Sequence, residues 1–343
     1  MVQVIEEYDL CFCGDVYAED PSKLFIGERL EKIFSNCKNV IVNLETPIVV
    51  NSRLIPMNKY SALKTNIKII DFLKKIGVKA VSLANNHIMD YGDSAAKFTK
   101  NALSRERIKS YGYGVSRSEA FQPCMLEVDG KKVGIIGFTT TFVSEALSKD
   151  DKPGVAGIRI ITRVEIDPRE ILEEPAAPYI VKGEVLNNDL TFLEKILKAA
   201  RKECDYLVLQ PHWGVGLAPY NKIVLDYVKT LARHSIDVGA ELIVGGHPHT
   251  FQPIEVYKGK PIFYSLGNLI FYPIMHEMEN LGIVLCINLK EKKADILFVE
   301  QKDNNIEVVD KIKNRPEIQY FYYMALRNGI KLGENDTFFE LNI

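Results

Sequence analysis

The chain has 343 residues, of which 47% are hydrophobic and 26% are charged, and its formal net charge is −2. This length is enough for one large α/β domain or two smaller ones. The nearly balanced charge removes any general electrostatic reason to expect a nucleic-acid partner. The six cysteines lie mostly in apolar runs, so we expect reduced, buried thiols.

No targeting or membrane-spanning signal is visible in the sequence. Residues 1–9 carry acidic side chains and no basic stretch of the kind that begins a signal peptide. No apolar run approaches the roughly 18–20 residues that are needed to cross a bilayer. We therefore expect a cytoplasmic protein that lies at most at the periphery of a membrane, through its surface.

The first half of the chain alternates predicted strands and helices. The expected order is strand 8–14, helix 22–34, strand 39–44, loop 46–64, helix 66–76, strand 78–83 and helix 94–107. Gly77 is a natural residue to end the second of these helices.

The second half adds hairpins to this alternation. Asp129-Gly130 is a strong hairpin signal and precedes a strand at 133–138. Further expected elements are helix 188–202, strand 206–209, helix 220–234, a strand at 242, the hairpins 253–257 with 262–266 and 282–289 with 294–299, and helix 316–328. Residues 143–183 show no periodicity and are expected to form an irregular insertion or lid. The pattern predicts an α/β fold, with one domain over 1–300 and a helical extension over 301–343 packed on it.

Two histidines separated by one residue form the most informative motif. His247 and His249 follow an apolar run and two glycines. In an extended chain, side chains two residues apart point the same way, which would let both imidazoles converge just past a strand end. Such a pair suggests a metal site, although two hydrogen-bonded loop histidines would give the same pattern.

Polar side chains recur at the carboxyl ends of predicted strands, where open α/β sheets bind ligands. The candidates are Asp15, Glu45, Asn86, His212, His247 and His249. Two carboxylates, one carboxamide and three imidazoles suit a pair of divalent ions such as Mn²⁺, Zn²⁺ or Fe²⁺. Such a pair can activate water as the nucleophile, which agrees with the lack of a GxSxG elbow or a P-loop in the sequence.

Asn86 and His87 are the candidate catalytic residues beside these ligands. Asn86 can bind a metal or a substrate oxygen, and His87 can donate a proton to a leaving group. The alternative is a helix-capping asparagine beside a loop histidine.

Several short motifs occur in an order that identifies a family. They are Gly14-Asp15, Asn43-Leu44-Glu45, Ala84-Asn85-Asn86-His87 with Asp90-Tyr91-Gly92, His212-Trp213-Gly214, Gly246-His247-Pro248-His249 and Tyr264-Ser265-Leu266-Gly267-Asn268. Over about residues 8–290 this order resembles the CapA family of poly-γ-glutamate capsule synthesis proteins, within the calcineurin-like metallophosphoesterase superfamily. The resemblance implies a four-layer α/β/β/α sandwich with a two-metal site.

The resemblance also implies roles for single residues. Asp15 matches the metal aspartate of the first strand, and Glu45 stands where the superfamily has a bridging aspartate. Asn86 and His87 match its Asn-His pair, with His87 as acid or substrate clamp. His212 matches the single histidine ligand, and His247 and His249 match the final pair.

Two departures from the superfamily pattern weaken one metal position. Tyr17 replaces a metal-binding histidine, and Glu45 replaces the bridging aspartate. We therefore expect either two metal ions of which one binds weakly, or metals that differ from those of a typical phosphatase. Because function depends on the site rather than the fold, phosphatase activity does not follow from the resemblance.

Four further residues are candidates for substrate contact. Lys59 can meet an anion, although a solvated loop lysine is the simpler interpretation, and Trp213 can form a wall of the site or pack in the core. Ser265 and Asn268 follow a predicted strand and would support the site.

Together these features predict a metal-dependent hydrolase-like enzyme that acts on an anionic capsule polymer, poly-γ-glutamate or similar, or on a small molecule. One alternative is a non-hydrolytic accessory of a capsule synthesis or export complex that docks on membrane proteins. Another is metal-assisted proton abstraction on a peptide.

Overall fold

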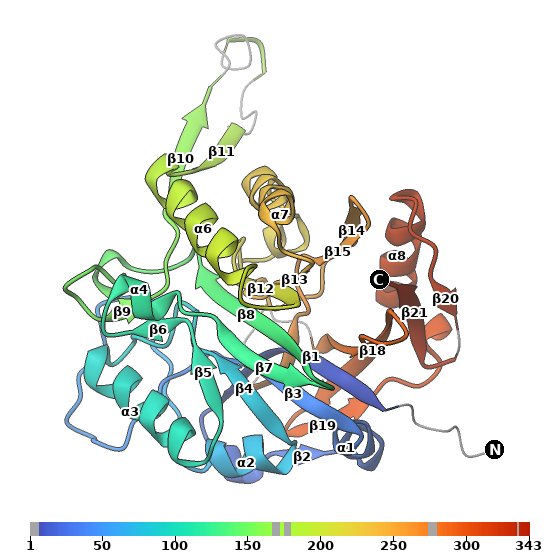
Figure 1. Cartoon of the computed structure of the whole chain (residues 1–343), viewed down its shortest axis with the longest axis horizontal. Coiled ribbons are helices and arrows are strands. Elements are labelled where there is room, and N and C mark those ends of the chain that lie inside the picture. Colours follow the sequence, from blue (N-terminus) through green and yellow to red (C-terminus); the bar gives the residue numbers. More distant parts are fainter. Residues whose placement is uncertain (1–6, 167–171, 175–179, 274–279, 335) are drawn as a thin grey trace.

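The computed structural model describes residues 7–166, 172–174, 180–273, 280–334 and 336–343. In this part of the chain, the strands form two large sheets and two small two-stranded ones (Figure 1). No helix among these residues is long and apolar enough to cross a membrane.

The larger sheet contains the N-terminal strand at its centre. Its order is β2 (Phe25–Ile26), β19 (Asn305–Val308), β18 (Lys293–Lys302), β17 (Leu281–Asn288), β1 (Tyr8–Ala18), β3 (Cys37–Leu44), β4 (Val78–Ser82) and β5 (Lys109–Tyr111). Beside this path, β16 (Asn268–Tyr272) pairs with β1, β21 (Phe338–Asn342) with β18, and β20 (Gly333–Glu334) with β21. Strand β1 is parallel to β3 and β16 and antiparallel to β17.

The second sheet has six strands. Its order is β14 (Ile254–Tyr257), β15 (Lys260–Phe263), β13 (Leu242–Val244), β12 (Tyr206–His212), β8 (Lys131–Thr139) and β7 (Cys124–Val128). The small sheets are β6 (Tyr113–Gly114) with β9 (Gly154–Val155), and β10 (Ile160–Glu165) with β11 (Ile180–Val185).

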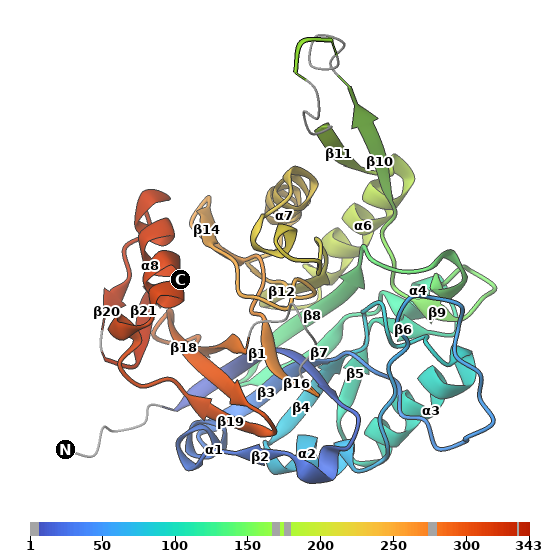
Figure 2. The same cartoon turned by 180° about the vertical axis from the view of Figure 1, so that it is seen from behind.

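Helices cover the outer faces of both large sheets (Figures 1 and 2). They are α1 (Glu28–Ser35), α2 (Ile69–Lys75), α3 (Gly92–Arg105), α4 (Arg117–Ala120), α6 (Asn187–Ala200) and α7 (Asp226–Val238). Helix α8 (Pro316–Arg327) instead packs its buried residues into the apolar layer between the sheets. Short 3-10 turns are η1 (Pro21–Lys23), η2 (Ser144–Ala146), η3 (Tyr220–Lys222) and η4 (Ile312–Asn314).

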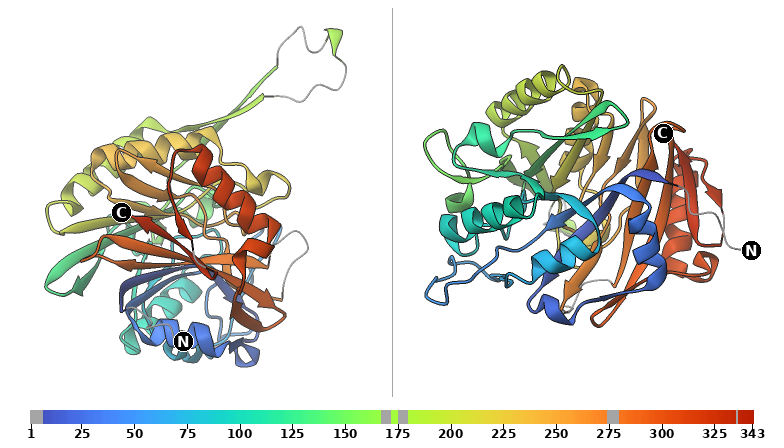
Figure 3. Two further views of the ribbon diagram at one scale, coloured as in Figure 1. Left: turned by 90° about the vertical axis from the view of Figure 1, so that its right-hand side faces the viewer. Right: turned by 60° about the horizontal axis from the view of Figure 1, so that its bottom comes forward.

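Three separate apolar layers show why the chain forms a four-layer sandwich. Because side chains alternate along a strand, Val40 faces the layer under α1, α2 and α3 while Ile41 faces the space between the sheets. In the second sheet, Val208 meets Ile41 in the middle layer, and Leu207 packs under α6 and α7. The predicted α/β/β/α architecture is confirmed, and the left view of Figure 3 shows the helices on opposite sides of the two sheets.

Some predicted elements begin or end elsewhere. Helix α1 starts at Glu28 rather than 22, because 25–26 pair with β19 as a strand. The predicted helix 220–234 is also wrong at its start. Only a 3-10 turn lies at 220–222, and α7 runs from Asp226 to Val238, where Gly239 with a φ of 131° caps it. The sequence does not predict β5 and β16, since each pairs with a strand distant in sequence. It also does not predict β19, although β19 forms a hairpin with β18.

Residues 143–183 are less irregular than expected. They contain η2, β9, β10 and the start of β11, and β10 and β11 form an antiparallel pair. After residue 300, β19, α8 and β21 follow, and both strands join the larger sheet through β18, which itself crosses residue 300. The division into 1–300 and 301–343 stays a prediction.

Candidate metal centre

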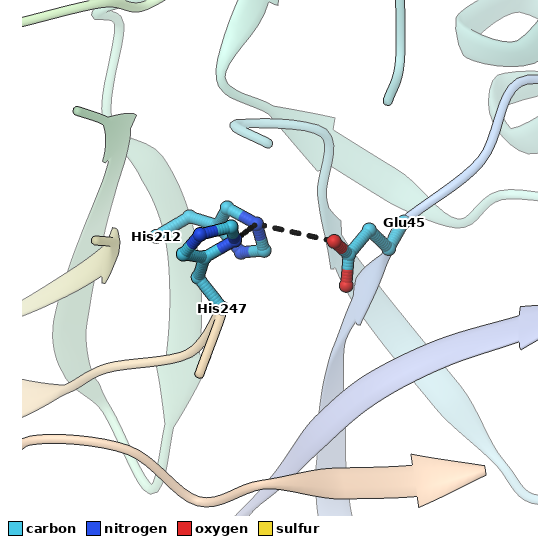
Figure 4. A group of neighbouring side chains, drawn as sticks. All are labelled: Glu45, His212 and His247. Atoms are coloured by element: carbon cyan, nitrogen blue, oxygen red, sulfur yellow. Dashed lines mark hydrogen bonds and ion pairs between the residues drawn. The ribbon is translucent and has the colours of Figure 1, made fainter. Parts of the chain in front are cut away.

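Polar side chains from both large sheets meet at one place. Two groups have ligand atoms within 4.8 Å of one another: Glu45, His212 and His247, and Asp15, Glu45 and His249. Figure 4 shows the first group, with dashed lines from His212 to Glu45 and to His247. Glu45 belongs to both groups. Five of the six predicted ligands therefore lie in these clusters, and Asn86 contacts them through His212.

Asp15 lies within β1 and not beyond its end, which corrects the predicted strand 8–14. The register of β1 against β16 shifts between Asp15 and Val16, and such an irregularity redirects a side chain. Oδ1 of Asp15 accepts from Nδ2 of Asn43 at 2.8 Å, and Oδ2 accepts from the backbone N–H of His247 at 3.0 Å. A Cβ on Gly246 would lie 2.8 Å from Oδ1, so glycine is required for this approach.

Glu45 is a buried carboxylate without a hydrogen bond. Its side chain is 0% exposed, and neither oxygen has a hydrogen-bond partner among the described residues. Burial raises the pKa of Glu45 well above its ordinary value; the Asp15 carboxylate adds to this and His249 opposes it. A buried carboxylate without a hydrogen-bond partner destabilises the fold. A cation bound beside Glu45 would offset this cost.

Three different atoms crowd one ring nitrogen of His212. Nε2 lies 2.8 Å from Oδ1 of Asn86, 3.1 Å from Nδ1 of His247 and 3.3 Å from Oε1 of Glu45. A single ring nitrogen carries at most one proton, so it cannot make a hydrogen bond to each of them. Atoms of this kind directed at a common point are typical of ligands around a metal ion.

The imidazoles of His212 and His247 are held in the neutral form that binds metals. Burial lowers the pKa of His212 to about 4, against the opposing effect of Asp15. Burial, together with His212 and His249, also lowers the pKa of His247 well below its ordinary value. On the other side of the centre, Nδ1 of His249 lies 3.0 Å from Oδ1 of Asn268, which fixes the ring.

His247 and His249 converge by a different route than the sequence predicted. Their φ angles are 96° and 55°, so neither residue is in an extended chain, and β13 already ends at Val244. Positive φ costs free energy in a residue other than glycine, and it persists where the surrounding structure enforces it. The hydrogen bond from the His247 backbone to Asp15 is one such constraint.

His87 belongs to a network beside the clusters. Its Nδ1 lies 2.6 Å from Oδ2 of Asp90, and Asp90 also accepts from Nζ of Lys59 at 2.7 Å. Lys59 in addition donates to the backbone oxygen of Asn86 at 2.7 Å. Burial lowers the pKa of His87 to about 4, which the Asp90 carboxylate opposes. Lys59 is therefore an anchored, largely buried residue and not a solvated loop lysine.

The other predicted substrate contacts lie behind the centre. Trp213 is fully buried, packs against Phe138 and Tyr264, and donates from Nε1 to the oxygen of Tyr264, so the structure places it in the outer core and not in a wall of the site. The Ser265 hydroxyl donates to the backbone oxygen of Thr250 and shapes the loop before β16.

Two asparagines complete the site, and neither was assigned a role from the sequence. Asn43 contacts both Asp15 and, at 3.3 Å, Nδ1 of His212. Asn85 donates to Oδ1 of Asn43 and to the backbone of Leu44, and its Oδ1 accepts from the N–H groups of His87 and Ile88. A buried asparagine inside an apolar strand such as 39–44 is unusual, and that composition was the available signal.

Comparison with known proteins gives matches over most of the chain. The family described as "Bacterial capsule synthesis protein PGA_cap" matches residues 9–273. The chain is 32% identical over 247 residues to "PGA biosynthesis protein CapA" of Bacillus subtilis (strain 168), which covers 72% of this chain and 56% of that protein. It is 26% identical over 253 residues to "Capsule biosynthesis protein CapA" of Bacillus anthracis, covering 72% of this chain and 54% of that protein.

The chain thus spans about half the length of these curated relatives. Among solved structures, a hypothetical protein from Thermus thermophilus aligns with a TM-score of 0.43 and 16% identity, over 88% of this chain and 97% of that one.

Proposed function

Because the chain belongs to the bacterial capsule synthesis protein PGA_cap family, as the match to residues 9–273 and the 32% identity to CapA establish, we propose that it acts in the synthesis or processing of an anionic capsule polymer. The names of the two Bacillus relatives support poly-γ-glutamate or a similar capsule component as the polymer. Within that role, we propose that the chain is a metal-dependent, hydrolase-like enzyme.

The single observation that carries the enzymatic part is Glu45. A carboxylate that is 0% exposed, lacks a hydrogen-bond partner and lies 3.3 Å from one imidazole and 3.7 Å from another is suited to hold cations. A structural role alone would favour glutamine or a methyl-bearing side chain there, because burying an unpaired charge destabilises the fold.

The donor set divides into two positions that share Glu45. One position would use Asn86, His212 and His247, and the other would use Asp15 and His249. Divalent cations bound in this way polarise a phosphoryl or carbonyl oxygen and make water acidic enough to attack it. The mixture of oxygen and imidazole ligands favours Mn²⁺, Zn²⁺ or Fe²⁺ over Ca²⁺.

The chain's own residues organise the proton transfer. Asp90 accepts from Nδ1 of His87 and fixes the ring, which burial keeps neutral. Nε2 would therefore first accept the proton that the attacking water loses and would then give it to the leaving group. Lys59 holds Asp90 in place from the other side. Asn43 and Asn268 orient Asp15 and His249 in the same manner.

Metal content tests this proposal most directly. Elemental analysis of untagged protein is compared with the double variant His247→Ala/His249→Ala. About two transition-metal equivalents in the wild type, and their loss in the variant, would support the binuclear centre. This result would justify assays on phosphoesters and γ-glutamyl polymers. Wild-type protein without metal after reconstitution with Mn²⁺ or Zn²⁺ would contradict it and favour a non-hydrolytic accessory of capsule synthesis.

A further inference from the structure

The two-stranded sheet of β10 and β11 projects away from the sandwich (Figure 3). Within the described residues, these strands pair only with each other. Their base is firmly attached, since Arg159 binds both oxygens of Asp189 in α6 at 2.8 Å and its carbonyl accepts from the N–H of Leu186 at 2.9 Å. The pair is thus a fixed arm, which we call the β10–β11 arm.

The arm exposes several apolar side chains to solvent. Val164 and Val181, which are cross-strand partners, are 57% and 65% exposed, and Ile161 is 41% exposed. A two-stranded ribbon alone is only marginally stable in water, and an open strand edge can pair with another strand. These features favour a further strand beside the arm.

Of the two edges, that of β10 offers more room to a partner strand, because β11 lies on the side of α7 (Figure 1). Strand β11 runs beside α7, where Gly183 lies so close to Tyr227 that an added Cβ would come within 2.6 Å of its ring. The N–H of Leu186 donates to the carbonyl of Arg159, so these two opposite residues form a hydrogen-bonded pair. In an antiparallel ladder every second residue forms such a pair, so the backbone groups of Arg163 and Glu165 also point toward β11. The N–H and C=O groups of Thr162 and Val164 therefore point outward.

The charges on β10 are arranged so that the strand is complementary to itself. Arg163 and Glu165 flank Val164, and both point to the same face. If two copies of β10 meet antiparallel about Val164, Arg163 of each copy faces Glu165 of the other. A parallel arrangement would instead place like charges opposite each other, which is unfavourable.

We propose that β10 pairs antiparallel with β10 of a second copy of this chain, about a two-fold axis at Val164, so that two arms form one four-stranded sheet. The N–H and C=O of Val164 in each copy then bond across the axis, and those of Thr162 bond to the second copy further along. Because six residues per strand bury less area than a standard interface, the dimer forms in a concentration-dependent equilibrium.

Sedimentation velocity of the full chain over a wide concentration range tests the pairing. Val164→Pro removes an N–H that makes no bond within the arm, and an edge strand tolerates proline at such a position, so the hairpin ladder should be retained. It should weaken self-association at least about tenfold, because two hydrogen bonds across the axis are lost. Val164→Thr is the matched control, which keeps the N–H and the branched shape, and it should associate like the wild type.

A charge exchange tests the register independently of the proline. Arg163→Glu and Glu165→Arg should each weaken the dimer, and the double variant should recover it, since opposite charges again face each other. Within one copy, Arg163 and Glu165 also pair with Glu184 and Lys182 at 3.0 and 2.7 Å. The control Lys182→Ala/Glu184→Ala removes these partners without altering the proposed interface and should leave the dimer intact.

Two results would overturn the proposal. The first is a wild type that stays monomeric at every concentration, which would leave the edge of β10 to a different protein. The second is a dimer that survives Val164→Pro and both charge reversals, which would place the interface elsewhere.

Discussion

Oδ1 of Asn86 lies 2.8 Å from Nε2 of His212, although the two residues come from different sheets. Asn86 follows β4 of the larger sheet, and His212 ends β12 of the smaller one. The candidate metal centre therefore lies where the carboxyl ends of both sheets meet. A contact of this kind requires the sandwich to be assembled, so the proposed metal binding would be coupled to the packing of the sheets.

Glu45→Gln separates stability from metal binding. In the metal-free protein, the amide replaces a buried, unpaired carboxylate, and the free energy of unfolding should rise by about 1–3 kcal/mol. Added Mn²⁺ or Zn²⁺ should stabilise the wild type and have a much smaller effect on the variant, because the shared ligand has lost its charge. Thermal unfolding with chelator and with metal measures both effects.

Glu127→Gln is the matched control, since Glu127 is exposed on β7 and far from the clusters in the fold. It should change neither stability nor the response to metal. A Glu45→Gln variant that is as strongly stabilised by metal as the wild type would count against Glu45 as a ligand.

The buried histidines predict an acid-sensitive metal-free fold. The pKa of His87 and that of His212 are lowered from 6.5 to about 4 by burial, so the unfolded chain takes up protons that the folded chain does not. Stability from this source is complete above about pH 6.5 and is lost as the pH falls toward 4. Each histidine contributes at most about 3 kcal/mol to this loss.

Denaturant unfolding of the metal-free Glu45→Gln protein across this pH range gives the cleanest measurement, because the opposite contribution of Glu45 is absent. His87→Gln in the same background should flatten the profile. Asn101→Gln, on the exposed surface of α3, is the control. Equal slopes in all three proteins would refute the assignment.

Asn268→Ala tests whether the ring of His249 must be fixed. The variant removes the 3.0 Å contact to Nδ1 without touching a proposed ligand atom. Metal affinity, measured by competition with a chromogenic chelator, should fall by about 10–100-fold. Asn101→Ala on the exposed surface of α3 should leave affinity unchanged. Equal affinity in both variants would show that His249 needs no such support.

The sequence predicts that the proposed ligands lie close together. It does not predict the backbone conformations that bring them there. Alternating strands and helices place Glu45 and His212 at strand ends, and local pattern is sufficient for that. The irregularity at Asp15 and the positive φ of His247 depend on each other through a hydrogen bond between residues 232 positions apart, so no local pattern encodes them.

The burial of Lys59 and Trp213 could not be predicted from the sequence for the same reason. Lys59 lies in a polar loop, and its partner Asp90 is 31 residues away. Trp213 directly follows the proposed ligand His212, yet its environment is set by Phe138 and Tyr264 from two neighbouring strand regions. Sequence motifs identify which residues gather at the site, and the packing of the two sheets decides which of them face it.

Lys59→Met tests the anchor of the His87 network. The variant leaves Asp90, whose side chain is 1% exposed, with its charge and without its ammonium partner. Loss of a charged hydrogen bond at a buried site should lower the free energy of unfolding by about 1.5–3 kcal/mol. Lys97→Met on the exposed face of α3 is the control and should stay close to the wild type. A Lys59→Met protein as stable as this control would mean that Asp90 does not need Lys59.

A comparison of His247→Gly with His247→Ala measures the free-energy cost of the positive φ at residue 247. Both variants lose the same imidazole, so both should lose metal. They differ in the backbone, because a φ of 96° is accessible to glycine and strained for alanine. The glycine variant should therefore be more stable than the alanine variant by about 1 kcal/mol, after the greater entropy of unfolded glycine is allowed for. Denaturant unfolding without metal measures the difference. If alanine is the more stable residue, the strain is not stored at His247, and the metal rather than the fold holds this turn in place.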